Sequence, residues 1–323
     1  MRSGAAIAVG AAALAAMTGL ALSVGRYPVG LADLFSGSDP NAAAVLLQIR
    51  APRIGAALLV GAALAAAGAV YQAILRNPLV SPDILGVSSG AAFGAVLAML
   101  AGLGAALVQA SAFAGGVLAV ALVYAVAIRL RRHDPLLALV LTGVVVGTLL
   151  ASLVSLLKLL ADPAGQLPAI TFWLLGSLTL ATPAELALAA VLLVAGLVPL
   201  IALRWRLDVL TLPDEEARAL GVEPARLRAV VIGAATLITA VSVALGGIIG
   251  WIGLLVPHAA RLMVGPAFAR LLPLSMLLGA AFLVAVDTLC RVIAQIELPP
   301  GVVTALLGTP LFLWLFAATR RTW

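Results

Sequence analysis

Three arginines, Arg50, Arg53 and Arg291, are the residues of this sequence best suited to bind an anion. Arg50 and Arg53 lie three apart in IRAPR, and Arg291 follows Asp287 by four residues. Because a guanidinium group binds a carboxylate through two parallel hydrogen bonds, these side chains predict a basic cluster, exposed at helix ends, for an anionic substrate or an acidic protein surface. An ion pair between Asp287 and Arg291 is the alternative interpretation of that pair.

A second polar region, 204–228, has the sequence RWRLDVLTLPDEEARALGVEPARLR and lies between long apolar stretches. It predicts a helix of about two turns, capped by Thr211, closed by Gly221, and with acidic residues at its positive end. Pro224 then begins the next helix. We expect the short helix to contact another protein; a plain link between membrane helices is the alternative. The apolar residues available for such a contact are Leu212, Ala217, Ala219 and Leu220.

Residues for catalysis, metal binding or nucleotide binding lack the spacing that these functions require. The sole cysteine is Cys290, and the two histidines, His133 and His258, are far apart in sequence. Lys158, the only lysine, lies in SLLKLL, which is not a phosphate-binding loop. We therefore expect no metal and no cofactor, and any energy from ATP must come from a partner. A membrane-embedded enzyme lacks catalytic groups here, and an ion-coupled carrier lacks an evident acid or base at mid-helix.

The composition is that of a polytopic membrane protein. Hydrophobic residues make up 64% of the 323 residues and charged residues only 10%, against about 25% charged residues in a soluble domain. The segment 84–128 has no formal charge and is about twice as long as one membrane crossing requires. Because alternating ten-residue strands are absent, the sequence predicts an all-α fold.

The apolar stretches predict about ten transmembrane helices. Single crossings are expected at 4–24, 54–75, 136–158, 186–203, 271–290 and 301–318, and two crossings each in 83–129 and 229–260. The proline-rich segment 162–185 predicts a short re-entrant or surface helix, and the prolines of 76–82 predict a turn. Gly86, Gly90 and Gly94, at four-residue spacing, predict a close helix contact, as do Gly143 and Gly147.

The sidedness of the basic residues favours ten crossings over nine. With ten, both termini share one side, and 14 of the 19 basic residues fall on it. The positive-inside rule then places both termini and the 204–228 loop in the cytoplasm. The basic residues on that side are Arg2, Arg76, Arg129, Arg131, Arg132, Arg204, Arg206, Arg218, Arg226, Arg228, Arg261, Arg270, Arg320 and Arg321.

Six motifs, in order over nearly the whole chain, resemble one family of membrane proteins. They are IRAPR (49–53), RNPLVSPDILGVSSGAAFG (76–94), FWLLGSL (172–178), EEARALGV (215–222), GWIGLLVPHAARLMVG (250–265) and ELPPGVVTALLGTPLFLWL (297–315). The chain resembles the FecCD-type permeases of binding-protein-dependent ABC importers, which take up iron-siderophore complexes, haem and cobalamin.

The resemblance implies a single transmembrane permease domain over 1–323 in a bacterial inner membrane, and not an enzyme. It implies a homodimer with the pathway between subunits, two cytoplasmic ATPases and a periplasmic substrate-binding protein. An iron complex, haem or ferric siderophore, is the expected substrate, and cobalamin is the alternative. For the function itself, an ion-coupled secondary carrier is the alternative.

The resemblance also assigns residues. By motif, Arg50, Arg53 and Arg291 receive acidic side chains of the binding protein, and Asn77 and Leu79 form a cytoplasmic gate. The coupling helix that fits a groove on the ATPase comprises Asp214, Glu215, Glu216, Ala217, Arg218, Ala219, Leu220 and Gly221.

Overall fold

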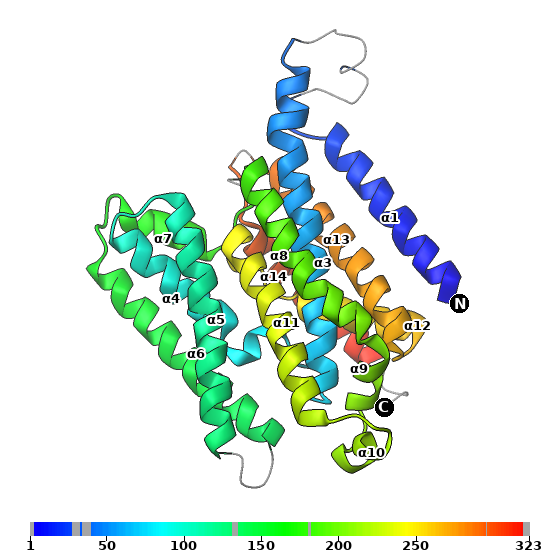
Figure 1. Cartoon of the computed structure of the whole chain (residues 1–323). Helices are drawn as coiled ribbons and strands as arrows, with labels where there is room; N and C mark the ends of the chain where they lie inside the picture. Colours follow the sequence, from blue (N-terminus) through cyan, green and yellow to red (C-terminus); the bar gives the residue numbers. More distant parts are fainter. Residues whose placement is uncertain are drawn as a thin grey trace.

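The computed structural model describes residues 3–27, 33, 40–130, 135–179, 182–294 and 296–318. Within these ranges every regular element is a helix (Figure 1), so the predicted all-α fold is confirmed. Several basic residues used in the sidedness argument, and one histidine, lie outside the described residues: Arg2, Arg131, Arg132, His133, Arg320 and Arg321.

Eight of the described helices are long and apolar enough to cross a membrane, and α4 and α12 are shorter apolar helices. Together they agree with the prediction of about ten. The ten are α1 (Ser3–Ser23), α3 (Ala51–Ile74), α4 (Val87–Leu100), α5 (Ala105–Leu130), α6 (Pro135–Leu160), α8 (Pro183–Ala202), α11 (Pro224–Gly246), α12 (Ile252–Val264), α13 (Phe268–Val292) and α14 (Pro300–Ala318). The short helices are η1 (Ala44–Arg50), η2 (Pro82–Leu85), α7 (Gln166–Leu174), α9 (Arg204–Leu210) and α10 (Asp214–Ala219).

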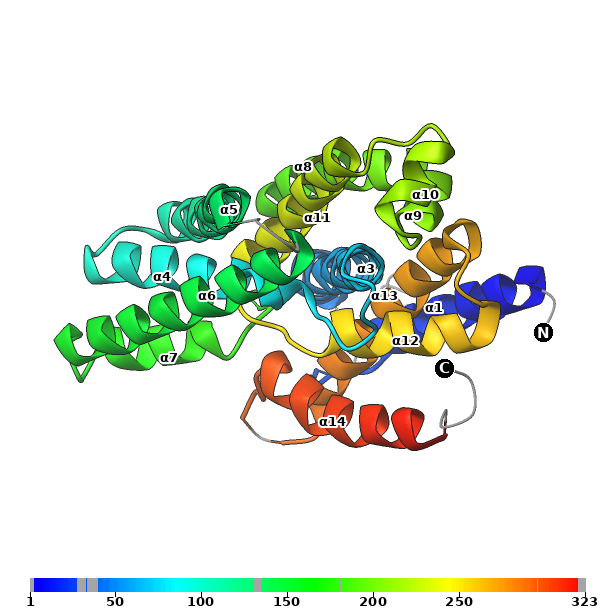
Figure 2. The same ribbon diagram turned by 90° about the horizontal axis from the view of Figure 1, so that it is seen from below.

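Helix α3 lies at the centre of the bundle, with α11 on one side and α12 and α13 on the other (Figure 2). Its alanines and glycines let the neighbouring backbones approach closely. A Cβ atom on Gly61 would lie 2.3 Å from the carbonyl oxygen of Gly279 in α13, and one on Gly68 would lie 1.8 Å from that of Gly253 in α12. Any larger residue at these crossings would push the helices apart, so α3 is fixed along its length.

The glycine spacing in 86–94 predicts a close helix contact, which is correct for two of the three residues, and the partner is α5. A Cβ atom on Gly90 would lie 2.4 Å from the Gly115 carbonyl oxygen, and one on Gly94 would lie 2.1 Å from that of Ser111. Gly86 is not part of the helical face, because it adopts φ 78° between η2 and α4. That left-handed conformation is accessible to glycine at little cost.

Two predicted interruptions of the apolar pattern are confirmed. Helix α11 ends at Gly246, Gly247 follows with φ 69°, and α12 begins at Ile252, so 229–260 forms two helices. The proline-rich segment 162–185 contains α7, whose nine residues are too few to cross a bilayer.

The polar region 204–228 forms two short helices, of which only α10 was expected. The predicted cap was wrong: α10 begins after Pro213 with no side-chain cap, because Thr211 ends α9 and its hydroxyl donates to the Asp208 carbonyl at 2.6 Å. The predicted end was right. Gly221 has φ 77°, and its N–H donates to the Arg218 carbonyl at 2.9 Å.

Candidate functional sites at the two ends of the bundle

Helix α3 runs from one end of the molecule to the other and separates two groups of candidate site residues (Figure 1). Arg50 and Arg53 lie where α3 begins, and we call this the Arg53 end. The turn with Asn77 and Leu79 follows the last residue of α3, and α9 and α10 lie at that same end, which we call the α10 end.

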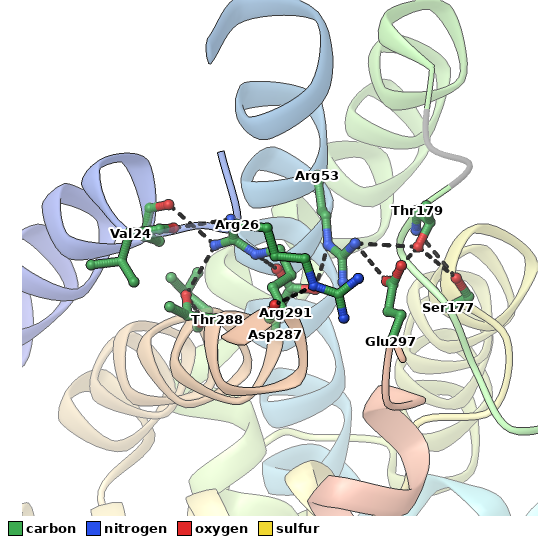
Figure 3. Close-up of polar contacts among 11 residues, drawn as sticks. Val24, Arg26, Arg53, Ser177, Thr179, Asp287, Thr288, Arg291 and Glu297 are labelled. Atoms are coloured by element: carbon green, nitrogen blue, oxygen red, sulfur yellow. Dashed lines mark hydrogen bonds and ion pairs between the residues drawn. The ribbon is translucent and has the colours of Figure 1, made fainter. Parts of the chain in front are cut away.

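At the Arg53 end, Arg53 is held by two carboxylates (Figure 3). Its Nε lies 2.7 Å from Asp287 Oδ1, and one terminal nitrogen lies 2.5 Å from Glu297 Oε1. Arg291 Nε lies 3.2 Å from Asp287 Oδ2, which confirms the predicted pair one helical turn apart. Asp287 therefore bridges two arginines, and its own side chain is only 1% exposed.

Arg50 and Arg291 also donate to backbone carbonyls in the last turn of α1 and in the segment that follows it. Arg50 donates to the Leu22 and Tyr27 carbonyl oxygens, both at 2.6 Å. Arg291 donates to the Ala21 carbonyl at 3.1 Å. The last carbonyls of a helix have no partner within it, and here arginine side chains supply the missing donors.

The prediction that the three arginines form an exposed cluster was wrong. Arg50 is 4% exposed and Arg53 is 6% exposed. The physical reason is that Asp287, Glu297 and backbone carbonyls within 21–27 accept from most of the guanidinium nitrogens, which offsets the cost of burying them between α1, α3 and α13. Among the described residues, Arg53 Nη2 has no hydrogen-bond partner. The prediction that the three lie together was right, because all three line one cavity of about 340 Å³.

Glu297 is a residue of this site that the arginine pattern did not identify. It follows α13 and accepts a hydrogen bond from the Thr179 hydroxyl at 2.6 Å. Arg53 also donates to that hydroxyl, at 3.3 Å. The segment after α7 and the segment before α14 therefore meet at Arg53, as Figure 3 shows. The acid opening the motif ELPP was the available signal.

At the α10 end, Asp214 joins three segments. It accepts hydrogen bonds from both terminal nitrogens of Arg228 in α11, one at 2.9 Å. Arg76, in the turn after α3, lies 3.1 Å from the same carboxylate and also donates to the Leu210 carbonyl at 3.3 Å. The Arg228 hydrogen bond, and then Arg76, lower the pKa of Asp214 below its usual 3.8.

The turn after α3 carries the two predicted gate residues. Its backbone is unusual, because Arg76 has φ 48° without being glycine. Asn77 accepts a hydrogen bond from the Leu79 N–H at 2.9 Å, and the Leu79 side chain is 51% exposed. The structure thus places both residues at the α10 end, one and three positions after Arg76, the arginine that contacts Asp214.

The apolar residues predicted for the contact of α10 with another protein differ in exposure. Ala217 is buried against its own chain, whereas Leu220 is 58% exposed. Leu212 is half-buried and Ala219 is exposed. The side chains of α10 available to another molecule therefore belong to Glu215, Glu216, Arg218, Ala219 and Leu220. Among the described residues, no three of His, Cys, Asp or Glu gather to hold a metal.

This fold, with ten apolar helices among the described residues, is that of a multi-pass membrane protein. The model of the FecCD transport family matches residues 13–318. The chain belongs to this family, whose members are ABC transporter permeases, and the predicted resemblance is confirmed.

Relatives and a solved structure match over most of their length. The chain is 39% identical to the molybdate import system permease of Haemophilus influenzae, covering 91% of this chain and 89% of that protein. It is also 39% identical to the Fe(3+) dicitrate permease FecD of Escherichia coli, covering 95% and 96%. An inward-facing chain of a metal-chelate type ABC transporter is 38% identical, with a TM-score of 0.90 over 97% of this chain and 98% of that chain.

Proposed function

We propose that this chain is the permease subunit of an ATP-driven importer that moves an iron complex, a ferric siderophore or haem, from the periplasm to the cytoplasm. The observation that carries the proposal is the pairing of two sites at opposite ends of α3. An arginine-lined cavity suits an acidic protein surface at one end, and an exposed short helix beside the gate residues suits an ATPase at the other.

The charge distribution supports an orientation with the α10 end in the cytoplasm. Arg204, Arg206, Arg218 and Arg226 are exposed at that end. Basic residues near membrane crossings are retained on the cytoplasmic side. The Arg53 end then faces the periplasm, and the chain lies in the bacterial inner membrane with both termini cytoplasmic.

In this orientation the arginine cavity receives acidic side chains of a periplasmic binding protein. Glu297 already forms an ion pair with one terminal nitrogen of Arg53, and the Glu297 side chain is 30% exposed. An incoming carboxylate therefore exchanges with Glu297, while the buried Asp287 keeps Arg53 and Arg291 in place. Partner exchange at a charge that is already buried avoids most of the desolvation that a free guanidinium would require.

At the cytoplasmic end, α10 docks in a groove of the ATPase. Leu220 is the exposed apolar contact, and Gly221 sets the direction in which the chain leaves the helix. Arg76 connects the docked helix to the gate residues Asn77 and Leu79. The working assembly contains two copies of this permease domain, residues 1–323, and two ATPases, and the pathway runs between the two copies.

The relatives differ in the substrates for which they are named, so the family does not fix the substrate. Besides molybdate and Fe(3+) dicitrate, one relative is named for haemin and another for cobalamin. The iron complex is our choice, cobalamin is the alternative, and the soluble binding protein selects among them. An ion-coupled carrier is a less favoured function.

Transport by the purified permease in liposomes tests the proposal. With the ATPase and a binding protein loaded with iron complex, haem or cobalamin, we expect uptake only when ATP is present. Binding of each ligand to the binding protein identifies the substrate. Uptake by the permease alone, driven by an ion gradient, would overturn the importer.

A further inference from the structure

Helices α5 and α11 lie on the side of the molecule away from α12 and α14 (Figure 2). A groove follows these two helices, with α8 also lining one end and α6 the other. It consists of three hollows of about 270, 310 and 160 Å³. Phe113 lines the first and second, and Tyr124 and Ile232 line the second and third, so the hollows follow one another along the same two helices.

The groove is about as long as the hydrocarbon core of a bilayer is thick. Its lining on α5 extends from Ala106 to Ile128, which is about 33 Å at 1.5 Å per residue. The hydrocarbon core of a bilayer is about 30 Å thick. The middle hollow is lined by apolar side chains together with Tyr124 and Thr236, so this part of the groove suits hydrocarbon.

The floor of the middle hollow is open because of one small residue. Gly233 lines it, and a Cβ atom built on Gly233 would have no atom within 4 Å. Glycines at the helix contacts of α3 and α4, in contrast, meet a neighbouring backbone at once. Gly233 therefore leaves space beside α11 that no described part of this chain fills.

The α10 end of the groove is basic. Arg218 and Arg228 line its mouth together with Asp214. Asp214 is already shared by Arg228 and Arg76, and among the described residues no carboxylate forms an ion pair with Arg218. Arg218 and Arg228 thus give this mouth two positive charges against one carboxylate. At the opposite end, the charged residue that lines the groove is an acid, Glu185.

We propose that this groove binds an anionic phospholipid, with the phosphate between Arg218 and Arg228 and an acyl chain along α5 and α11 past Gly233. Basic pockets between membrane helices favour anionic headgroups, and a protein helix would not need the net positive charge at one mouth. The site is separate from the arginine cavity and does not depend on which substrate is transported. Because Arg218 belongs to α10, the lipid contacts the element that we propose to dock the ATPase.

The test measures lipid retained by the full chain after detergent purification from membranes, by native mass spectrometry. The probes are phosphatidylglycerol and phosphatidylcholine, each added back to delipidated protein. We expect the wild-type chain to retain phosphatidylglycerol at about one molecule per chain, and phosphatidylcholine at least several-fold less. Equal retention of the two lipids would overturn the anionic headgroup site.

Two variants locate the site. Gly233→Leu fills the open floor, and Arg218→Gln removes the headgroup charge; each should lower phosphatidylglycerol retention at least fivefold. Their matched controls are Val230→Leu, an exposed position of α11 outside the groove, and Arg226→Gln, an exposed arginine outside it. Retention is the readout because Arg218 also belongs to the proposed coupling helix. Unchanged retention in Gly233→Leu would overturn the proposal.

Further measurements distinguish folding and other occupants. Leucine is a better helix former than glycine, so Gly233→Leu should not lower the unfolding temperature. If the unfolding temperature of Gly233→Leu does fall, Ala121→Leu on the opposite wall of the middle hollow is a second variant that fills the groove. Competition by inorganic phosphate alone, in the millimolar range, would indicate an ion site and overturn the acyl-chain assignment. A change of oligomeric state in Gly233→Leu would indicate a second copy in the groove and also overturn it.

Discussion

At the scale of single residues, the two carboxylates that hold Arg53 differ in exposure. The Asp287 side chain is 1% exposed and that of Glu297 is 30% exposed. Removing Arg53 would leave only Arg291 to balance the buried negative charge of Asp287, and would destabilise the chain by about 3–5 kcal/mol. Charge reversal at Arg53 is therefore a poor probe of docking, because it changes stability as well.

Glu297→Gln is the cleaner variant at this site. Glutamine keeps the acceptor for Thr179 but removes the charge that competes for Arg53. We expect the binding protein to bind about three- to tenfold more tightly at low salt, with the difference shrinking as salt screens the charges. Surface plasmon resonance measures the affinity, and Glu223→Gln at the opposite end is the control. Weaker or unchanged binding would show that Glu297 does not compete.

The second residue-scale prediction concerns the pH dependence of Asp214. Its folded pKa is lowered below 3.8, chiefly by the Arg228 hydrogen bond. The stabilisation is therefore fully present above the unfolded pKa and is lost as pH falls through the lowered folded pKa. Asp214→Asn should lower stability by about 1 kcal/mol, allowing for the partial exposure of the carboxylate.

The measurement is the difference in unfolding temperature between Asp214→Asn and the wild type. This difference should be constant from about pH 5 to 8 and disappear in acid below the folded pKa. A difference that changes across neutral pH would mean that another group, and not Asp214, holds Arg76 and Arg228.

At the scale of elements, the sequence predicted helices better than their ends and contacts. Apolar length and glycine or proline breaks located the crossings, since these features act within one segment. Thr211 failed as a cap because α9 extends to Leu210, which the charge pattern did not show. The burial of Arg50 and the partial burial of Arg291 depend on carbonyls near residue 22 and on packing between distant segments. Residue spacing carries no information about such acceptors.

The element most open to a direct test is α10, through Gly221. Its φ of 77° suits glycine, and a Cβ atom there would meet no neighbour, so a substitution acts on the backbone alone. Gly221→Val should destabilise the local structure by about 1–2 kcal/mol and change the direction in which the chain leaves α10. We expect normal membrane insertion and normal dimer formation, and loss of ATP-driven uptake in liposomes.

The matched control for this element is Gly221→Asn, since asparagine accepts the left-handed conformation more readily than valine. It should retain most of the uptake. If Gly221→Val transports at the wild-type rate, 204–228 is a plain link between membrane helices, which was the alternative from the sequence.

At the scale of the whole molecule, α3 is a buried connection between the two sites. Its 24 residues span about 36 Å. One arginine near its start is paired with Asp287 and Glu297, and Arg76 beyond its end is paired with Asp214. Close contacts at Gly61 and Gly68 leave α3 little freedom to bend. We therefore expect a displacement at either end to move α3 together with the helices packed on it.

Arg76→Gln tests whether this connection carries the coupling. Arg76 holds a strained φ of 48° through its contacts with α9 and α10, and glutamine cannot maintain the ion pair with Asp214. We expect ATP-driven uptake to fall at least tenfold, while ATPase binding and binding-protein affinity at the Arg53 end stay within about twofold. Arg204→Gln, an exposed arginine of α9, is the control and should transport normally. Wild-type uptake in Arg76→Gln would mean that α10 moves the gate residues through backbone packing alone.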